Sequence, residues 1–321
     1  MAQQLNKRIE SIYLLKALSS FFVVVLHSGF FLMEWVYFII GVGTPCFLCI
    51  TGYLLYTNNL SRELEKCIKW AKKSFKLLLI CCLLYWGFYE VMGWKEISIM
   101  EFMLNLLHGS SICIVLWYLA ALWQALLLFG LIRRYVPKLI YVFPFVFAVA
   151  YAIRTHPDVV CPSLDWYEAH FWRCNAIVMS LPFLCTGYLI RKHKEWLLSH
   201  IKVVVWLPIV LVLLLGEYLL RKHYDWPLSC YFVLTYPCIV LLLLFCVRFP
   251  SLKLPFINYV GLKHSANIYY FHIAVLGIGN SLGIWPSKWE AVMLWLLCIP
   301  VSMLFNTVMK GVSQCFTRKH A

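Results

Sequence analysis

Charged residues are scarce in this chain. Asp, Glu, Lys and Arg together make up 13% of its 321 residues, and 63% are hydrophobic. Soluble domains carry about 25% charged residues, so this composition excludes an ordinary soluble domain and indicates a polytopic membrane protein. Acidic residues are the rarest: 14 Asp and Glu stand against 28 Lys and Arg, which gives a net charge of +14.

Ten apolar stretches approach the roughly 20 residues that a helix needs to cross a bilayer. The connections between them are brief, which leaves no room for a separate soluble domain. We therefore expect an all-α, polytopic membrane helix bundle of about ten transmembrane helices, forming one domain over residues 1–321. The ten stretches are 12–33, 36–56, 75–93, 112–132, 138–153, 174–190, 203–220, 229–247, 265–283 and 289–308.

The basic residues gather on one side of this topology. With ten spans, 21 of the 28 Lys and Arg fall on the side that holds both termini, six fall on the other side, and Lys16 lies within the first stretch. This asymmetry follows the positive-inside rule and predicts that both termini are cytoplasmic. It also explains the basic charge without nucleic acid, so we expect a bilayer and no nucleic-acid partner.

Most cysteines lie within the apolar stretches, where cysteine packs as a small apolar residue. Cys161 and Cys174 flank the longest predicted outer loop and are able to pair in an oxidising compartment. Spacing alone does not establish that bond. We expect no metal site.

His27 and Lys16 are the most informative pair in the first stretch. Eleven residues of helix place them about 16 Å apart along the axis and about 20° apart around it. Ser20 falls on the same stripe. An ionisable group inside a bilayer is costly unless it has a partner or a role, so these residues form a functional-site hypothesis.

Five short patterns follow one another along the chain. The first joins Lys16 to His27 through a valine-rich run. The others are Thr51-Gly52-Tyr53 in the second stretch, the basic run with Lys66, Lys69, Lys72, Lys73 and Lys76, the segment Trp117-Tyr118-Leu119, and Ser265 with Ile268, Tyr269, Tyr270 and His272.

In this order, the five patterns resemble those of the acyltransferase-3 family of integral membrane acyltransferases. That family has Arg, ten residues and His in the first span, then Ser-Gly-Tyr/Phe, Arg-x-x-Arg, Trp-Tyr/Phe-Leu and Ser…Ile-Tyr…His. Here Lys16 stands in place of Arg, Thr51 in place of Ser, and the basic run is built of lysines. Lysine keeps the charge but loses the planar, two-pronged donor of arginine.

The resemblance implies an enzyme of the cytoplasmic (inner) membrane. It would move an acyl group, usually acetyl, from cytoplasmic acyl-CoA to a hydroxyl of a surface or lipid-linked carbohydrate. Acyl-CoA would be a co-substrate, with no bound cofactor.

The candidate residues divide by chemistry. Burial favours the neutral imidazole, so His27 is the candidate general base, with His272 as a second catalytic residue. The oxyanion needs a donor, for which Tyr118, Tyr269, Tyr270 and His272 are candidates, with Trp117 beside the substrate. Phosphates of acyl-CoA would meet Lys16 and the basic loop, in which Lys73 and Lys76 match the family spacing best and Lys69 and Lys72 lie beside them. Direct transfer and a covalent acyl-histidine route both remain open.

Structural interpretations remain open beside these. His27 can pack against a neighbouring span, and Trp117 and Tyr118 can be interface anchors. The lysine run can set the membrane topology through the positive-inside rule and can attract anionic lipid headgroups. A transporter or flippase with an intramembrane His/Lys path, or a non-catalytic membrane partner on the same scaffold, are the alternative functions. A transporter would favour inverted repeats with broken helices, and the sequence shows neither.

Overall fold

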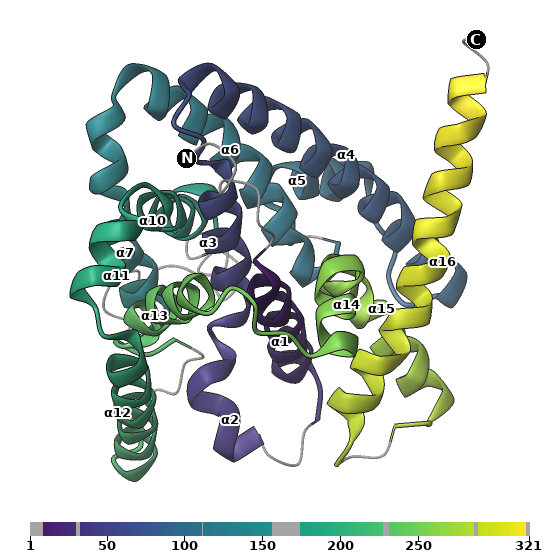
Figure 1. Cartoon of the computed structure of the whole chain (residues 1–321). Helices are drawn as coiled ribbons and strands as arrows, with labels where there is room; N and C mark the ends of the chain where they lie inside the picture. Colours follow the sequence, from purple (N-terminus) through teal and green to yellow (C-terminus); the bar gives the residue numbers. More distant parts are fainter. Residues whose placement is uncertain are drawn as a thin grey trace.

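The computed structural model describes residues 9–29, 33–110, 112–155, 174–226, 231–285 and 288–318, and this part of the chain is helical without a β-strand (Figure 1). The all-α prediction is confirmed. The helices are α1 (Glu10–His27), α2 (Met33–Ile40), α3 (Gly43–Leu55), α4 (Leu60–Met92), α5 (Ile99–His108), α6 (Trp117–Tyr135), α7 (Phe143–Thr155), α10 (Leu181–Lys192), α11 (Lys194–His200), α12 (Val203–His223), α13 (Thr235–Arg248), α14 (Pro255–Lys263), α15 (Ser265–Leu282) and α16 (Glu290–Arg318), with the short turns η2 (Ile114–Leu116), η3 (Pro137–Tyr141) and η4 (Ala176–Ser180).

Six segments of the described chain are long and apolar enough to cross a membrane. They are Glu10–His27, Met33–Leu55, Leu60–Met92, Ile114–Tyr135, Val203–His223 and Glu290–Gly311. The other four predicted spans fall on α7, α10, α13 and α15, which are shorter or more polar. The outer loop with Cys161 lies outside the described residues, so the Cys161–Cys174 pairing stays a prediction.

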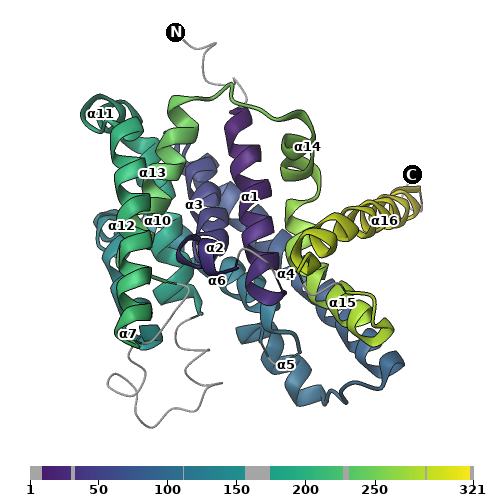
Figure 2. The same ribbon diagram turned by 90° about the horizontal axis from the view of Figure 1, so that it is seen from below.

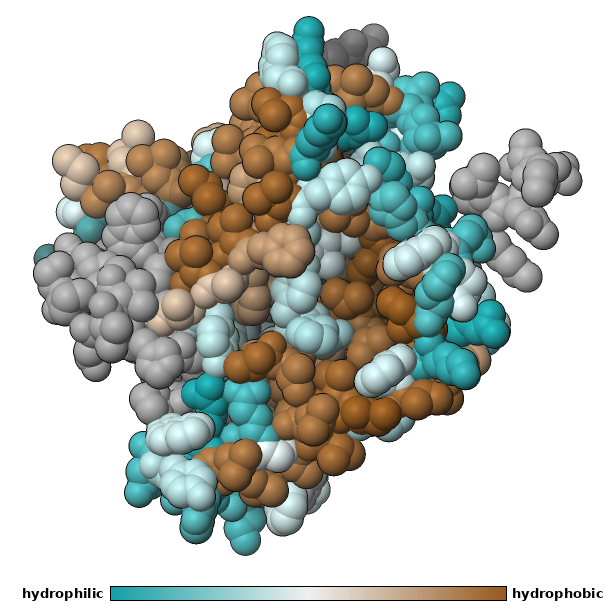
Figure 3. Space-filling model, turned by 90° about the vertical axis from the view of Figure 1, so that its left-hand side faces the viewer, coloured by the Kyte–Doolittle hydropathy of each residue, from teal (hydrophilic) through white to brown (hydrophobic). Residues whose placement is uncertain are grey.

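The surface supports a multi-pass membrane protein. Figure 3 shows a face dominated by apolar residues, with hydrophilic residues gathered toward its edges. On α12 the exposed side chains include Val204, Trp206, Val212 and Leu219. Exposed apolar surface of this extent is unusual for a soluble monomer and is the surface expected to face lipid.

The basic run belongs to a helix, which corrects the expected loop. Asn59 caps α4 by accepting a hydrogen bond from the Arg62 amide at 3.0 Å, and the helix continues for 33 residues to Gly93, which ends it in the left-handed region at φ 63°. Glu63, Cys67 and Ala71 are buried on one face, while Lys69, Lys72, Lys73 and Lys76 are exposed. The helical spacing of the buried residues therefore makes this segment a helix, even though its basic charge suggested a loop.

Two glycines bring α3 and α10 into backbone contact near the centre of the molecule. A Cβ atom at Gly52 would overlap the Leu184 carbonyl, and one at Gly187 would overlap the Cys49 carbonyl. Small residues at a helix crossing allow this close approach in membrane bundles. Gly52, the middle residue of the second sequence pattern, is therefore a packing residue.

A third glycine sets α14 against α1. A Cβ atom at Gly261 would overlap the carbonyl oxygen of Tyr13. Figure 2 shows α14 beside one side of α1, with α13 and then α12 on the other side. Helix α1, which carries Lys16 and His27, is thus held between neighbours on both sides.

A buried carboxylate joins α4, α6 and α10. Glu63 is fully buried and its Oε2 pairs with the Nε of Arg133 at 3.0 Å. The Tyr188 hydroxyl donates to the same oxygen at 3.0 Å, and the Thr57 amide donates to Oε1 at 3.0 Å. Because every charge in this cluster has a close partner, it ties the three helices together at one end of the bundle.

We predict that Gly187→Ala lowers the free energy of unfolding by about 3 kcal/mol, because the new methyl group meets backbone that cannot move aside. Gly216→Ala on α12 is the matched control, since its Cβ enters open space and alanine favours a helix. Denaturation in detergent micelles measures both variants. Equal stability of Gly187→Ala and the wild type would show that the crossing is not tight.

A second prediction concerns the buried ion pair. Arg133→Leu leaves Glu63 buried without its cation and should cost about 3 kcal/mol of stability. The double variant Arg133→Leu/Glu63→Leu should regain most of this loss, since an apolar pair often replaces a buried ion pair at little cost. The same denaturation assay compares the variants. A double variant less stable than Arg133→Leu would contradict this account.

Candidate active site

His27 is the last residue of α1, so the helix ends at this ring rather than continuing to residue 33 as the apolar stretch suggested. The chain that follows is anchored to the start of α16. The Gly29 amide donates to Glu290 Oε2 at 3.0 Å, and the Gly29 carbonyl accepts from the Ala291 amide at 2.9 Å.

His272 lies beside His27, with 5.3 Å between the ring centroids and 41° between the ring planes. The two residues come from the first and fifth sequence patterns, near opposite ends of the chain. His272 is fully buried on α15. The structure therefore brings together the two residues predicted to be catalytic.

The hydrogen bonds of His272 define its tautomer. Its Nδ1 lies 2.9 Å from the Tyr269 carbonyl oxygen and 3.2 Å from that of Ile268. Both oxygens only accept, so Nδ1 carries the hydrogen and Nε2 of the neutral ring carries a lone pair. Within the described residues this Nε2 is buried without a hydrogen-bond partner. A buried, unsatisfied acceptor next to a second imidazole is typical of a functional group rather than a packing residue.

Aromatic side chains extend from the histidine pair toward α6. Tyr269 lies 6.3 Å from His272 and 5.0 Å from Tyr118, measured between ring centroids. Phe47 of α3 packs edge-on against both tyrosines, and Trp117 lies 6.3 Å from Tyr118. The predicted residues of α1, α6 and α15 thus form one continuous cluster.

Threonines of α3 lie near the two central hydroxyl groups. Thr51 is a polar neighbour of Tyr118, and Thr44 is a polar neighbour of Tyr269. Thr51 also donates to the Phe47 carbonyl at 2.8 Å. A threonine at position 51 therefore supplies the hydroxyl for which the family uses serine.

Tyr270 is also buried and within electrostatic reach of Tyr118 and Tyr269. Its carbonyl oxygen accepts a hydrogen bond from the Tyr85 hydroxyl at 2.7 Å. This bond links α15 to α4, so the backbone of Tyr270 has a structural role whatever its ring does.

The predicted lysines do not form one cluster. Lys16 is half-buried on α1, and Lys73 is the charged group that acts on it electrostatically. Lys69, Lys72 and Lys76 are exposed on α4 and form no ion pair within the described chain. Among the lysines of the run, the structure therefore associates Lys73 with Lys16.

Sequence reasoning missed Thr44 and Glu290. Thr44 lies seven residues before Thr51, two helical turns away on the same face, so a polar stripe in the second apolar stretch was available as a signal. The sequence around Glu290 contains no such signal, because the role of this residue depends on a hydrogen bond to Gly29 that forms only in the folded protein.

A comparison with family models supports the resemblance drawn from the sequence. A model described as an acyltransferase domain matches residues 9–310, nearly the whole chain. No curated protein and no solved structure matches significantly. The matched region contains the histidine pair, the aromatic cluster and the lysines of α4, and the chain therefore belongs to the acyltransferase-3 family of membrane acyltransferases.

Proposed function

We propose that this protein transfers an acyl group, usually acetyl in this family, from cytoplasmic acyl-CoA to a hydroxyl of a surface or lipid-linked carbohydrate. The observation that carries the proposal is the 5.3 Å approach of His27 and His272 inside a membrane acyltransferase. Two imidazoles at this distance can hold and pass one proton, which is the requirement of transfer to a hydroxyl.

His27 acts as the general base, and His272 positions it. During the reaction, the unused lone pair on His272 Nε2 accepts the N–H of His27, and the other His27 nitrogen then faces the acceptor hydroxyl. The hydroxyl oxygen attacks the thioester carbonyl carbon while His27 takes its proton. The C–S bond then breaks, and the proton passes to the departing CoA sulfur. A covalent acyl-histidine route would use the same pair.

The tyrosine cluster supplies donors for the oxyanion that forms on the carbonyl. Tyr269 and Tyr118 are buried near the pair, with Thr44 and Thr51 as polar neighbours of their hydroxyl groups. Donors held in place before the reaction stabilise developing charge better than donors that must reorient. Trp117 packs on Tyr118 and supports this arrangement.

The donor approaches along α1 from the predicted cytoplasmic side. Lys73 and Lys16 are electrostatic neighbours, and two cations in proximity suit the phosphates of CoA. Lys16 precedes His27 by about 16 Å of helix, a distance that the extended pantetheine arm can span. The positive-inside asymmetry supports cytoplasmic termini and an inner-membrane location.

We predict that His27→Ala lowers acyl transfer by about 10²- to 10⁴-fold, the usual contribution of a positioned base. Purified protein in liposomes, supplied with acetyl-CoA and a hydroxyl-bearing glycan extract, gives the rate. His200→Ala, which removes an exposed histidine of α11, is the control. Normal transfer by a folded His27→Ala protein would remove the catalytic assignment. No transfer by the wild type would favour the transporter or the non-catalytic partner.

The positioning role of His272 has its own test. His272→Asn keeps a donor toward the Tyr269 carbonyl but loses the Nε2 lone pair, so kcat should fall while KM for acyl-CoA stays unchanged. His272→Gln places an amide oxygen near the former Nε2 and should restore part of kcat. A purely structural residue would change melting temperature and both constants together in the two variants.

Lys73→Ala should raise KM for acyl-CoA about fivefold, since an exposed ion pair contributes up to about 1 kcal/mol. Lys69→Ala, on the same helix but without Lys16 as a neighbour, is the matched control. Steady-state kinetics at low and high salt measures both, and salt should shrink the difference. Equal KM values in the two variants would mean that the lysines only set the membrane topology and do not bind acyl-CoA.

A further inference from the structure

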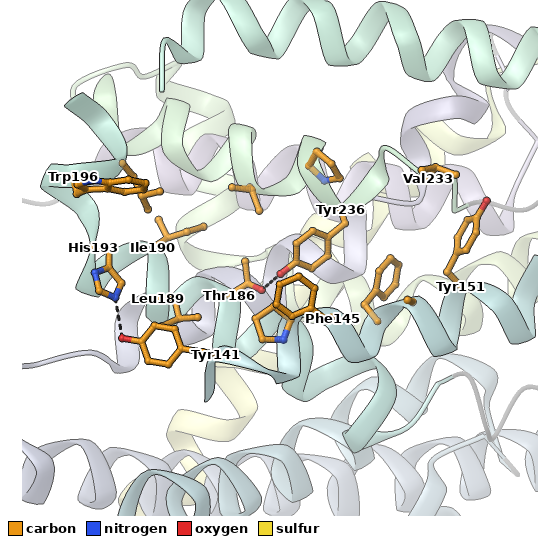
Figure 4. A pocket seen from close by; sticks show the side chains of 16 residues that line it. Tyr141, Phe145, Tyr151, Thr186, Leu189, Ile190, His193, Trp196, Val233 and Tyr236 are labelled. Atoms are coloured by element: carbon orange, nitrogen blue, oxygen red, sulfur yellow. Dashed lines mark hydrogen bonds between the residues drawn. The ribbon is translucent and has the colours of Figure 1, made fainter. Parts of the chain in front are cut away.

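A groove lies between α7, α10, α11 and α13, away from the histidine pair (Figure 4). Its volume is about 930 Å³, and none of the predicted site residues lines it. In Figure 4, His193 and Trp196 lie at one end, Tyr151 and Val233 at the other, and Tyr236 between them. The stretch from Tyr141 to Tyr151 corresponds to about 15 Å of helix, half the thickness of a bilayer core.

The middle of the groove offers nothing to a polar ligand. Its polar groups there are the hydroxyls of Thr186 and Tyr236, which hydrogen-bond to each other. Thr186 donates its hydrogen to the Pro182 carbonyl at 2.7 Å, so Tyr236 is the donor between the two hydroxyls. Apolar side chains such as Phe145, Ala148 and Val240 form the rest. A hydrocarbon chain fits this lining.

The two ends of the groove differ in charge. At the Tyr151 end, Arg221 donates to the Tyr151 hydroxyl at 2.7 Å and pairs with Glu217 at 3.0 Å, so its charge is compensated. At the other end, the Lys192 ammonium donates to the Tyr141 hydroxyl at 2.9 Å, and this hydroxyl lies 3.0 Å from His193 Nε2. No carboxylate of the described chain pairs with Lys192.

The Lys192 end therefore presents spare donors and positive charge. An ammonium has three N–H groups, of which Tyr141 takes one. Tyr141 has one hydrogen to give to His193 Nε2, which leaves Nδ1–H as a donor on the neutral ring. An anion beside Lys192 and His193 would accept their free hydrogens and neutralise the ammonium charge. At the opposite end, Glu217 already neutralises Arg221, so an anion gains little there.

We propose that the groove holds one anionic phospholipid, with its phosphate against Lys192 and His193 and an acyl chain along the apolar lining. The Lys192 end lies on the side that the basic residues predict to be cytoplasmic, so the lipid would come from the inner leaflet. The site is separate from the histidine pair and does not depend on the acyltransfer chemistry.

Native mass spectrometry of the full-length protein, released from bilayers of equal phosphatidylglycerol and phosphatidylcholine, tests the site. The wild type should retain phosphatidylglycerol about fivefold over phosphatidylcholine, the effect of one lysine near an anionic headgroup. Lys192→Gln should abolish the preference, whereas Lys253→Gln, at an exposed lysine before α14, should keep it. Equal retention of both lipids by the wild type would overturn the proposal, as would equal loss in the two lysine variants.

A second pair of variants tests the hydrocarbon part. Ala148→Trp fills the groove and should reduce retention of both lipids several-fold. Val212→Trp adds the same side chain to an exposed position of α12 outside the groove and should not. Melting temperatures show whether each variant is folded. Unchanged retention in folded Ala148→Trp would show that the bound lipid lies elsewhere.

Discussion

The close approach of α3 and α10, at Gly52 against Leu184 and at Gly187 against Cys49, determines where the rest of the molecule can lie. Without side chains at these positions, the α3 and α10 backbones touch, which places α3 deep in the bundle. From there Thr44, Phe47 and Thr51 reach the tyrosines of α15 and α6. In a bilayer, helices gain little from hydrophobic burial against one another, so close packing at small residues and specific hydrogen bonds must supply the stability. Here one helix, α3, supplies the close packing through Gly52 and directs Thr44, Phe47 and Thr51 toward the site.

The histidine pair places two titratable rings side by side in an apolar interior. His272 uses Nδ1 on helix carbonyls and leaves Nε2 unsatisfied within the described chain, beside the ring of His27. That arrangement fixes the tautomer before any substrate arrives. Two positive rings at 5.3 Å would repel each other strongly in a low-dielectric site, so the pair favours at most one extra proton. Holding one proton between two bases is useful to a transferase whose acceptor must lose a proton and whose leaving group must gain one.

Sequence patterns predicted the helices better than their ends. Apolar runs located helices because lipid and core both favour apolar segments, although six segments of the described chain, not ten, are long and apolar enough to cross a membrane. The same runs could not show that α1 stops at His27. That stop depends on Glu290 holding Gly29, a contact between opposite ends of the chain. The basic run was expected in a loop because its charge was conspicuous, although its buried face already had a helical period. The motifs identified His27, His272, Tyr118 and Tyr269 correctly as neighbours. They favoured Lys73 and Lys76 over Lys69 and Lys72 but could not separate Lys73 from Lys76, because that distinction comes from the position of Lys16 on another helix.

The shortage of acidic residues leaves many cations of this protein without a carboxylate partner. With 28 Lys and Arg against 14 Asp and Glu, at least half of the cations have no carboxylate to pair with. The structure assigns its carboxylates to structural cations, as in the pairs Glu63–Arg133 and Glu217–Arg221. Lys73 and Lys192 receive none in the described chain, and their surroundings differ. Lys73 is exposed on α4 near Lys16, and Lys192 lies at the rim of an apolar groove. The two proposals follow this difference: the exposed face of α4 suits a water-soluble CoA, and a cation that borders hydrocarbon suits a lipid.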